Sequence, residues 1–231
     1  MKKHKEKGVG MMAKLKAMIF DLDGVITDSA KYHYLAWKAL ADELNIPFDE
    51  EYNEKLKGVS RMASLELILQ NGDACDKYTY EEKVAMTEKK NDLYKELIKQ
   101  MTPDDILPGI EAFLTSLRES GVKVALASAS KNAPFILKQL GIEEYFDFIG
   151  DAAAAKPKPE PDIFLMGRDA FGFTSDECVG VEDAEAGVEA IHSAGMKSVG
   201  VGTPELMHAA DFVTSTADLD LAAIKKAFDM E

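Results

Sequence analysis

The chain has few cysteines and no long hydrophobic run. Its two cysteines, Cys75 and Cys178, lie far apart and form no CxxC pair, so neither a disulfide framework nor a zinc site is expected. No apolar stretch approaches the roughly 20 residues that a membrane-spanning helix needs. We therefore expect a protein that stays out of the membrane and works in the reducing cytoplasm.

Basic residues are also in short supply. The chain holds 27 Lys and Arg residues against 41 Asp and Glu residues, a formal net charge of −14. A field of this sign repels phosphate backbones and anionic lipid, so nucleic acid and membrane surfaces are not expected as partners. An anionic substrate would need a locally basic pocket. The hydrophobic fraction of 46% nevertheless indicates a chain that folds.

The length of 231 residues favours one core domain that carries a smaller insertion. Residues 1–12 are basic, but the apolar stretch that follows, Ala17–Phe20, is too short for the core of a signal peptide. We expect a disordered tail over residues 1–12.

Short apolar runs, each ending at polar or small residues, predict strands buried in a parallel sheet. The runs are Ala17–Phe20, Val122–Ala127, Cys178–Val181 and Ser198–Val201. Between them, apolar residues at helical spacing, followed by glycine, predict helices over about 110–120, 132–140 and 184–194. This alternation predicts an α/β fold with a doubly wound, Rossmann-like parallel sheet.

One long stretch breaks the alternation. Residues 32–106 show helical periodicity, including a long helix over about 80–100, and no convincing buried strand. Leu107-Pro108-Gly109 marks the return to the sheet. The sequence therefore predicts a helical-bundle cap over 32–106, inserted into a core domain formed by 13–31 and 107–231.

Residues able to hold a cation follow the predicted strands. Asp21 and Asp23 follow the first strand, Ser128 follows the second, and Glu182 with Asp183 follows the third. Ligands of open parallel sheets bind beyond the carboxyl ends of the strands. Carboxylates suit Mg²⁺ and a hydroxyl suits phosphate, so the set is typical of phosphoryl transfer.

Each of these residues also has a structural interpretation. Asp21 and Asp23 could form a turn, and Ser128 could cap a helix. Glu182 and Asp183 could stabilise the start of the next helix through its dipole. Their joint occurrence at strand ends favours a functional site.

The same residues resemble the motifs of the haloacid dehalogenase (HAD) superfamily. Phe20-Asp21-Leu22-Asp23-Gly24-Val25 resembles its nucleophile motif, while Ser128, Lys158 and Glu182-Asp183 resemble the other motifs in order. Lys156 offers a second candidate for the motif lysine. We prefer Lys158, because Pro161-Asp162 follows it at the family spacing.

Further segments resemble the phosphosugar mutases of this superfamily: Asp28-Ser29, Tyr32-His33, Leu56–Arg61, Lys90-Asn91-Asp92 and Ser128–Asn132. The resemblance implies an isomerase of carbohydrate metabolism that interconverts β-D-glucose 1-phosphate and glucose 6-phosphate through an aspartyl phosphate. It also implies Mg²⁺ as cofactor, glucose 1,6-bisphosphate as activator and intermediate, and sugar phosphates as the binding partners of a monomer.

The resemblance further implies residue roles. Asp21 would be the nucleophile and Asp23 the general acid and base. Mg²⁺ would bind Asp21, Glu182, Asp183 and the backbone carbonyl of Asp23. Phosphate and substrate would be bound by Ser128, Ala129, Ser130, Lys131, Asn132, Lys158, Arg61, Lys57, Gly58, Val59, Ser60, Ser64, His33, Trp37 and Lys90.

Some of these assignments have alternatives. Trp37 shares a helical face with Tyr34 and Leu40, which favours packing inside the cap over contact with a ligand. Lys57, Arg61 and Lys90 could be ordinary solvated residues.

The function has alternatives as well. A sugar-phosphate phosphatase of the same superfamily would share Asp21, Asp23 and the metal site. It would not need the second phosphate site that Arg61, Ser130 and Asn132 would supply. A non-catalytic phosphosugar-binding module is disfavoured, because both aspartates remain.

Overall fold

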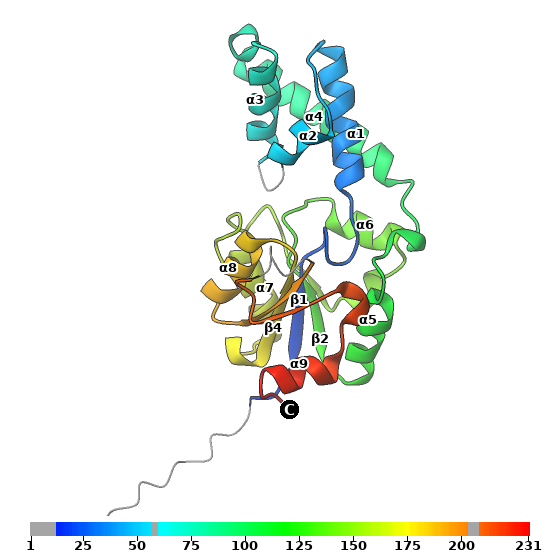
Figure 1. Ribbon diagram of the computed structural model, residues 1–231, viewed down its shortest axis with the longest axis vertical. Helices are drawn as coiled ribbons and strands as arrows, with labels where there is room; N and C mark the ends of the chain where they lie inside the picture. Colours follow the sequence, from blue (N-terminus) through cyan, green and yellow to red (C-terminus); the bar gives the residue numbers. More distant parts are fainter. Residues whose placement is uncertain (1–12, 57–59, 203–207) are drawn as a thin grey trace, which may run out of the picture. The chain divides into compact units, whose positions relative to one another are not determined.

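The chain forms two compact units, drawn in Figure 1, in a computed structural model that describes residues 13–56, 60–202 and 208–231. The first unit comprises the chain up to Thr27 and from Ile106 onward, and the second comprises Asp28–Asp105. The expected tail, 1–12, lies outside the described residues. The cap boundaries suggested by the sequence, 32–106, stay a prediction.

The first unit is built on a parallel sheet with the strand order β3-β2-β1-β4-β5-β6. The strands are β1 (Ala17–Phe20), β2 (Lys123–Leu126), β3 (Phe148–Ile149), β4 (Cys178–Glu182), β5 (Lys197–Val201) and β6 (Phe212–Thr214). This topology confirms the predicted doubly wound α/β fold.

The sequence did not predict the two edge strands, β3 and β6. They are 2 and 3 residues long and only half-buried, so neither produces the continuous apolar run that marks a buried strand. The boundaries of the predicted strands shift by a residue at some ends. Glu182, in particular, is the last residue of β4 and does not follow it.

Helices cover both faces of this sheet (Figure 1). On one face pack α7 (Asp162–Phe171) and α8 (Glu185–Ser193), and on the other lies α5 (Ile110–Glu119) with α9 (Leu221–Ala227) beside it. The remaining helix, α6 (Ala133–Gln139), follows β2.

Strand β1 is buried on both of its faces. Ile19 belongs to the hydrophobic cluster that includes Phe164 of α7 and Ile191 of α8. On the opposite face, Phe20 meets the ring of Phe113 edge-on, with 6.1 Å between the ring centroids. Burial on both sides explains the unbroken apolar run in the sequence.

The second unit is helical. Its helices are α1 (Ala30–Glu43), α2 (Glu50–Asn53), α3 (Arg61–Asn71) and α4 (Tyr80–Ile98). Leu40, Leu65, Ile68 and Leu69 pack into one apolar core. As predicted, no strand occurs in this unit among the residues that can be described, 28–56 and 60–105.

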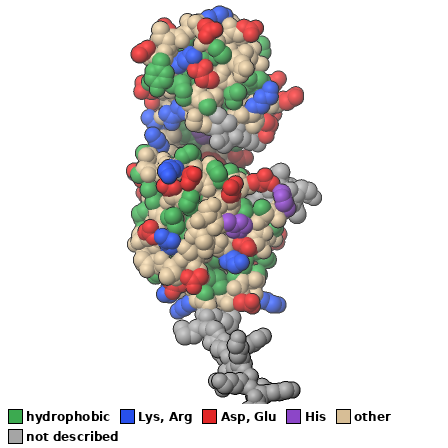
Figure 2. Space-filling view, turned by 90° about the vertical axis from the view of Figure 1, so that its left-hand side faces the viewer, with side chains coloured by type: hydrophobic (Ala, Val, Ile, Leu, Met, Phe, Trp, Pro, Cys, Tyr) green, Lys and Arg blue, Asp and Glu red, His purple; other side chains and the backbone are tan. Residues whose placement is uncertain are grey.

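Charged side chains are dispersed over the surface. On the face drawn in Figure 2, Lys and Arg side chains lie singly or in small groups among acidic and uncharged ones. Within the described ranges, no helix has both the length and the apolar character that a membrane crossing requires.

Candidate active site

The strands β1 and β4 lie side by side at the point where the strand order reverses, and open α/β sheets bind ligands beyond the strand ends there. Phe20 is in register with Val181, and the backbone N–H of Asp21 donates to the carbonyl of Val181 at 3.0 Å. Asp21 and Glu182 therefore stand next to each other at the carboxyl ends of adjacent strands.

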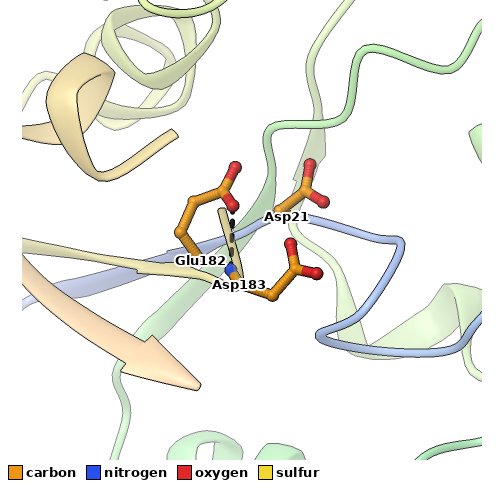
Figure 3. Close-up of side chains that lie close together, drawn as sticks. All are labelled: Asp21, Glu182 and Asp183. Carbon is orange, nitrogen blue, oxygen red and sulfur yellow. Dashed lines mark hydrogen bonds between the residues drawn. The ribbon is translucent and has the colours of Figure 1, made fainter. Parts of the chain in front are cut away.

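Three carboxylates converge at this edge (Figure 3). Asp21, Glu182 and Asp183 each offer a carboxylate oxygen, and these oxygens lie within 4.8 Å of one another. Glu182 is 1% exposed. Oε2 of its side chain accepts hydrogen bonds from the backbone N–H groups of Asp183 at 2.8 Å and Ala184 at 3.0 Å. These bonds fix the Glu182 carboxylate in one orientation.

Two glycines leave room for these carboxylates. Gly24 has a φ of +78°, and a methyl group on it would lie 1.9 Å from Oδ2 of Asp183. Gly187 lies in α8, and a methyl group there would lie 2.0 Å from Oε1 of Glu182. Only glycine fits either place without displacing an acidic side chain.

Burial and neighbouring negative charges raise the pKa values of two carboxylates of the cluster. Burial raises the pKa of Asp21 to about 7, and the charges of Glu182 and Asp23 add to the rise, while Lys158 opposes it. Burial, followed by the charges of Glu182 and Asp21, raises the pKa of Asp183 to about 8.

Lys158 is the basic partner of the cluster. Its Nζ donates to Oδ1 of Asp21 at 2.7 Å and also pairs with Glu182. Burial disfavours the charged lysine, but Asp21 and Glu182 together raise the pKa of Lys158. Lys156 is exposed, so Lys158 is the lysine that lies at the acidic cluster.

The donor set fits a hard divalent cation. It consists of carboxylate oxygens, which Mg²⁺ prefers over nitrogen and sulfur ligands. The raised pKa values of Asp21 and Asp183 indicate carboxylates that need a further positive charge to ionise fully near neutral pH. This acidic group could hold a metal ion.

The loop after β2 carries hydroxyl groups. Ser128 is buried, and its Oγ accepts from the N–H of Ser130 at 3.1 Å. Oγ of Ser130 in turn accepts from the N–H of Asn132 at 3.3 Å, directly before α6. Ala129 and Lys131 are exposed.

The other predicted residues lie in the second unit. His33 of α1 contacts Lys90 of α4, whose ammonium also faces the ring of Trp37. Trp37 is 4% exposed and belongs to the apolar core, as its helical face indicated. Arg61 is exposed and donates to Oδ1 of Asn91 at 2.9 Å.

Two further predicted residues, Ser60 and Ser64, lie at the start of α3. Ser60 caps this helix by accepting from the N–H of Ala63 at 3.3 Å, and Ser64 is buried. Lys57, Gly58 and Val59 lie outside the described residues. The candidates thus form one group at the sheet edge and another in the helical unit.

Sequence reasoning missed two residues that contact these groups. Gly187 beneath Glu182 had a local signal, because a glycine inside a predicted helix indicates a close approach. Tyr94 follows Lys90 by one helical turn, and that spacing places both on the same face of α4. Neither signal identifies which residue Gly187 or Tyr94 contacts.

The parallel sheet and the acidic cluster at its switch point are those of an α/β protein with a candidate metal site. The comparisons with known proteins identify the family. The family described as haloacid dehalogenase-like hydrolase matches residues 15–195. The chain therefore belongs to this family, which confirms the resemblance found in the sequence.

Individual proteins similar to this chain include mutases and a phosphatase. The chain is 49% identical over 217 residues to the β-phosphoglucomutase of Bacillus subtilis strain 168, covering 93% of this chain and 96% of that protein. The structure is similar to the crystal structure of β-phosphoglucomutase from Clostridium difficile, with a TM-score of 0.86, 47% identity and coverage of 93% and 97%. A phosphorylated carbohydrates phosphatase of Thermotoga maritima is 28% identical over 189 residues, covering 80% of this chain and 84% of that protein.

Proposed function

We propose that this chain is a β-phosphoglucomutase, an isomerase that interconverts β-D-glucose 1-phosphate and glucose 6-phosphate. The observation that carries the proposal is the convergence of Asp21, Glu182, Asp183 and Lys158 at the switch point. The chain that contains it is 49% identical, over 93% of its length, to a β-phosphoglucomutase. The phosphatases among the relatives are more distant.

In this proposal Asp21, Glu182, Asp183 and the backbone carbonyl of Asp23 hold Mg²⁺. The ion supplies positive charge that lets a carboxylate approach a phosphate. Lys158 and Ser128 bind the oxygens of the transferring phosphoryl group. Lys158 already contacts Asp21, so it can neutralise the phosphate at the point of transfer.

The reaction then has two phosphoryl transfers. The aspartyl phosphate on Asp21 is attacked by the 6-hydroxyl of β-glucose 1-phosphate, and Asp23 takes the hydroxyl proton. The product is β-glucose 1,6-bisphosphate and a free Asp21 carboxylate. After the bisphosphate turns round, Asp21 attacks the phosphorus at C1, the bond from phosphorus to the C1 oxygen breaks, and Asp23 returns the proton to that oxygen. Glucose 6-phosphate leaves, and Asp21 is phosphorylated again.

The second unit would bind the part of the substrate that does not react. Arg61 offers a planar guanidinium, which suits a phosphate, and Asn91 holds it at 2.9 Å. Ser130, Asn132, His33 and Lys90 are proposed as further substrate contacts. Transfer to a sugar, and not to water, requires that solvent be kept away from the aspartyl phosphate.

A coupled assay tests the proposal. The protein is given Mg²⁺, trace glucose 1,6-bisphosphate and either anomer of glucose 1-phosphate, and both glucose 6-phosphate and inorganic phosphate are measured. We expect glucose 6-phosphate from the β anomer alone, and loss of at least about a thousandfold in kcat for Asp21→Asn. Phosphate release without glucose 6-phosphate would instead identify a phosphatase.

A further inference from the structure

Tyr94 of α4 is completely buried and makes two specific contacts, one with α1 and one with Ser29, the residue directly before α1. Its hydroxyl lies 3.0 Å from Oγ of Ser29. Its ring stacks on the imidazole of His33, with 4.0 Å between the ring centroids and 22° between the planes. Ser29 and His33 are one helical turn apart, and the N–H of His33 donates to the carbonyl of Ser29 at 3.2 Å. Tyr94 therefore holds the first turn of α1 at two points.

The imidazole of His33 is also held by Lys90. The Nζ atom of Lys90 lies 2.9 Å from Nδ1 of His33, 4.6 Å from the ring centroid of Trp37 and 5.0 Å from that of Tyr94. Lys90 is 3% exposed, and among the described residues it forms no salt bridge with a carboxylate. Aromatic faces attract an ammonium group and partly replace its hydration.

We propose that Tyr94 is a positioning residue that fixes the plane and the tautomer of His33, so that the ring presents Nε2–H as a hydrogen-bond donor. While Lys90 is charged, its ammonium group can only donate, so Nδ1 of His33 accepts from Lys90. The proton of a neutral imidazole then resides on Nε2. Stacking against Tyr94 keeps the ring in the plane in which Nδ1 faces Lys90.

The charge state of His33 agrees with this assignment. Burial, together with the nearby charges of Lys90 and Arg61, lowers the pKa of His33 to about 3. The ring is therefore neutral under physiological conditions. Burial also lowers the pKa of Lys90 to about 7, with a contribution from Arg61, so Lys90 is charged at pH 6.

The role of this donor rests on the proposed function. A neutral N–H donor beside a charged Lys90 can bind a hydroxyl or phosphate oxygen of the sugar phosphate without adding a second positive charge. Tyr94 would act on the substrate only through His33, because Tyr94 is completely buried and its hydroxyl contacts Ser29.

Nitrogen-15 NMR of the histidine side chains at pH 6 tests the positioning directly. The chain has four histidines, and the His33→Gln variant assigns the signals of His33. In the wild-type protein we expect one His33 tautomer, with a bare Nδ1 and a protonated Nε2. Tyr94→Phe should broaden these signals, and Tyr94→Leu should average the two nitrogens.

Tyr52→Phe is the matched control for lost stability. It removes a tyrosine hydroxyl that donates to the carbonyl of Leu67 at 2.7 Å in the same unit, away from His33. We expect it to leave the His33 signals unchanged and to keep wild-type kcat/KM, whereas Tyr94→Leu lowers kcat/KM by at least about tenfold.

The inference is overturned if Tyr94→Phe, which keeps the ring and should fold, and Tyr94→Leu both leave the His33 signals unchanged. It is also overturned if Tyr52→Phe loses as much kcat/KM as the Tyr94 variants at equal loss of thermal stability. The NMR result does not depend on turnover. Shifted His33 signals in a protein without mutase activity would support the positioning role while rejecting the proposed function.

Discussion

At the scale of single residues, the acidic cluster depends on two glycines, whose lack of a side chain leaves room for the carboxylates. Gly24 and Gly187 each leave space that a methyl group would take from an acidic side chain. Gly187 is the more informative of the two, because it lies inside a helix, where alanine has a higher helix propensity than glycine. Helix propensity and the space required by Glu182 therefore make opposite demands on this position.

Gly187→Ala tests the space that Glu182 needs. Alanine favours the helix by about 1 kcal/mol, but its methyl group displaces the buried Glu182 carboxylate, which then loses its hydrogen bonds to the backbone N–H groups of Asp183 and Ala184. We expect Mg²⁺ affinity to fall by about tenfold or more, with the metal-free protein unfolding at a lower temperature because the lost hydrogen bonds outweigh the gain in helix propensity. Calorimetric titration and thermal denaturation in EDTA measure the two effects.

Ala186→Gly serves as the control, since Ala186 is the exposed neighbour of Gly187 in the same helix. It should lower stability and leave Mg²⁺ affinity unchanged. Wild-type affinity in Gly187→Ala would mean that Glu182 can move aside without loss and that the glycine has no role in the metal site.

At the scale of elements, helix ends place the charged residues. Ser60 caps α3 directly before Arg61, the first residue of that helix. Thr79 caps α4 through a capping box with Glu82. Both caps satisfy backbone N–H groups that the helix itself leaves unpaired. Only the first lies beside a residue proposed to bind phosphate.

Ser60→Ala should therefore weaken substrate binding as well as stability. Loss of the cap costs about 1 kcal/mol and loosens the turn that carries Arg61. We expect KM for β-glucose 1-phosphate to rise by about threefold to tenfold while kcat changes little. Steady-state kinetics, with thermal denaturation in parallel, provide the measurement.

Two further variants define the interpretation. Ser60→Thr keeps a capping hydroxyl and should restore KM. Thr79→Ala should lose similar stability with an unchanged KM. If Thr79→Ala raises KM as much as Ser60→Ala does, general loosening of the unit, and not the position of Arg61, accounts for the effect.

At the scale of the whole molecule, the acidic cluster links folding to pH and to metal. The folded state raises the pKa of Asp21 to about 7 and of Asp183 to about 8, chiefly through burial, from the ordinary value of 3.8. At a pH between 3.8 and these raised pKa values, the two aspartates bind more protons in the folded state than in the unfolded state. The contribution of the two aspartates to stability is therefore largest at acidic pH and is lost as the pH rises through 7 and 8.

A bound cation should reverse this loss, because it favours the ionised carboxylates. We expect one fixed concentration of Mg²⁺ to raise Tm more at pH 8.5 than at pH 6; at one hundred times the Kd that holds at pH 8.5, the gain at that pH is about 2.7 kcal/mol. Differential scanning calorimetry in EDTA and in Mg²⁺, at both pH values, measures it. An equal increase at the two pH values would contradict the assignment of Asp21 and Asp183.

Comparing the stability of the protein with and without metal at the same pH also removes the opposing contribution of Lys90 to its pH dependence. The folded state lowers the pKa of Lys90 to about 7 from 10.5, so this residue makes folding more favourable as the pH rises above 7. Because Lys90 is not among the proposed ligands, its effect is present in both samples and cancels in the difference.

The sequence by itself determined the class of fold and the chemistry of its site. Buried parallel strands and helices that end at glycine produce local sequence patterns. The strand Ala17–Phe20 and the helix ending before Gly121 could therefore be predicted from the sequence alone. Asp21 at a strand end, followed by the other motifs in order, predicted the family that the comparisons then confirmed.

Only the tertiary structure decided which residues meet. Lys158 lies 137 positions from Asp21 in the sequence, yet it bonds to that residue, whereas Lys156 remains exposed. The short edge strands, the space above Gly187 and the stacking of Tyr94 on His33 are likewise products of contacts between distant segments. Local periodicity records which face of an element is buried, but it carries no information on the partner that buries it.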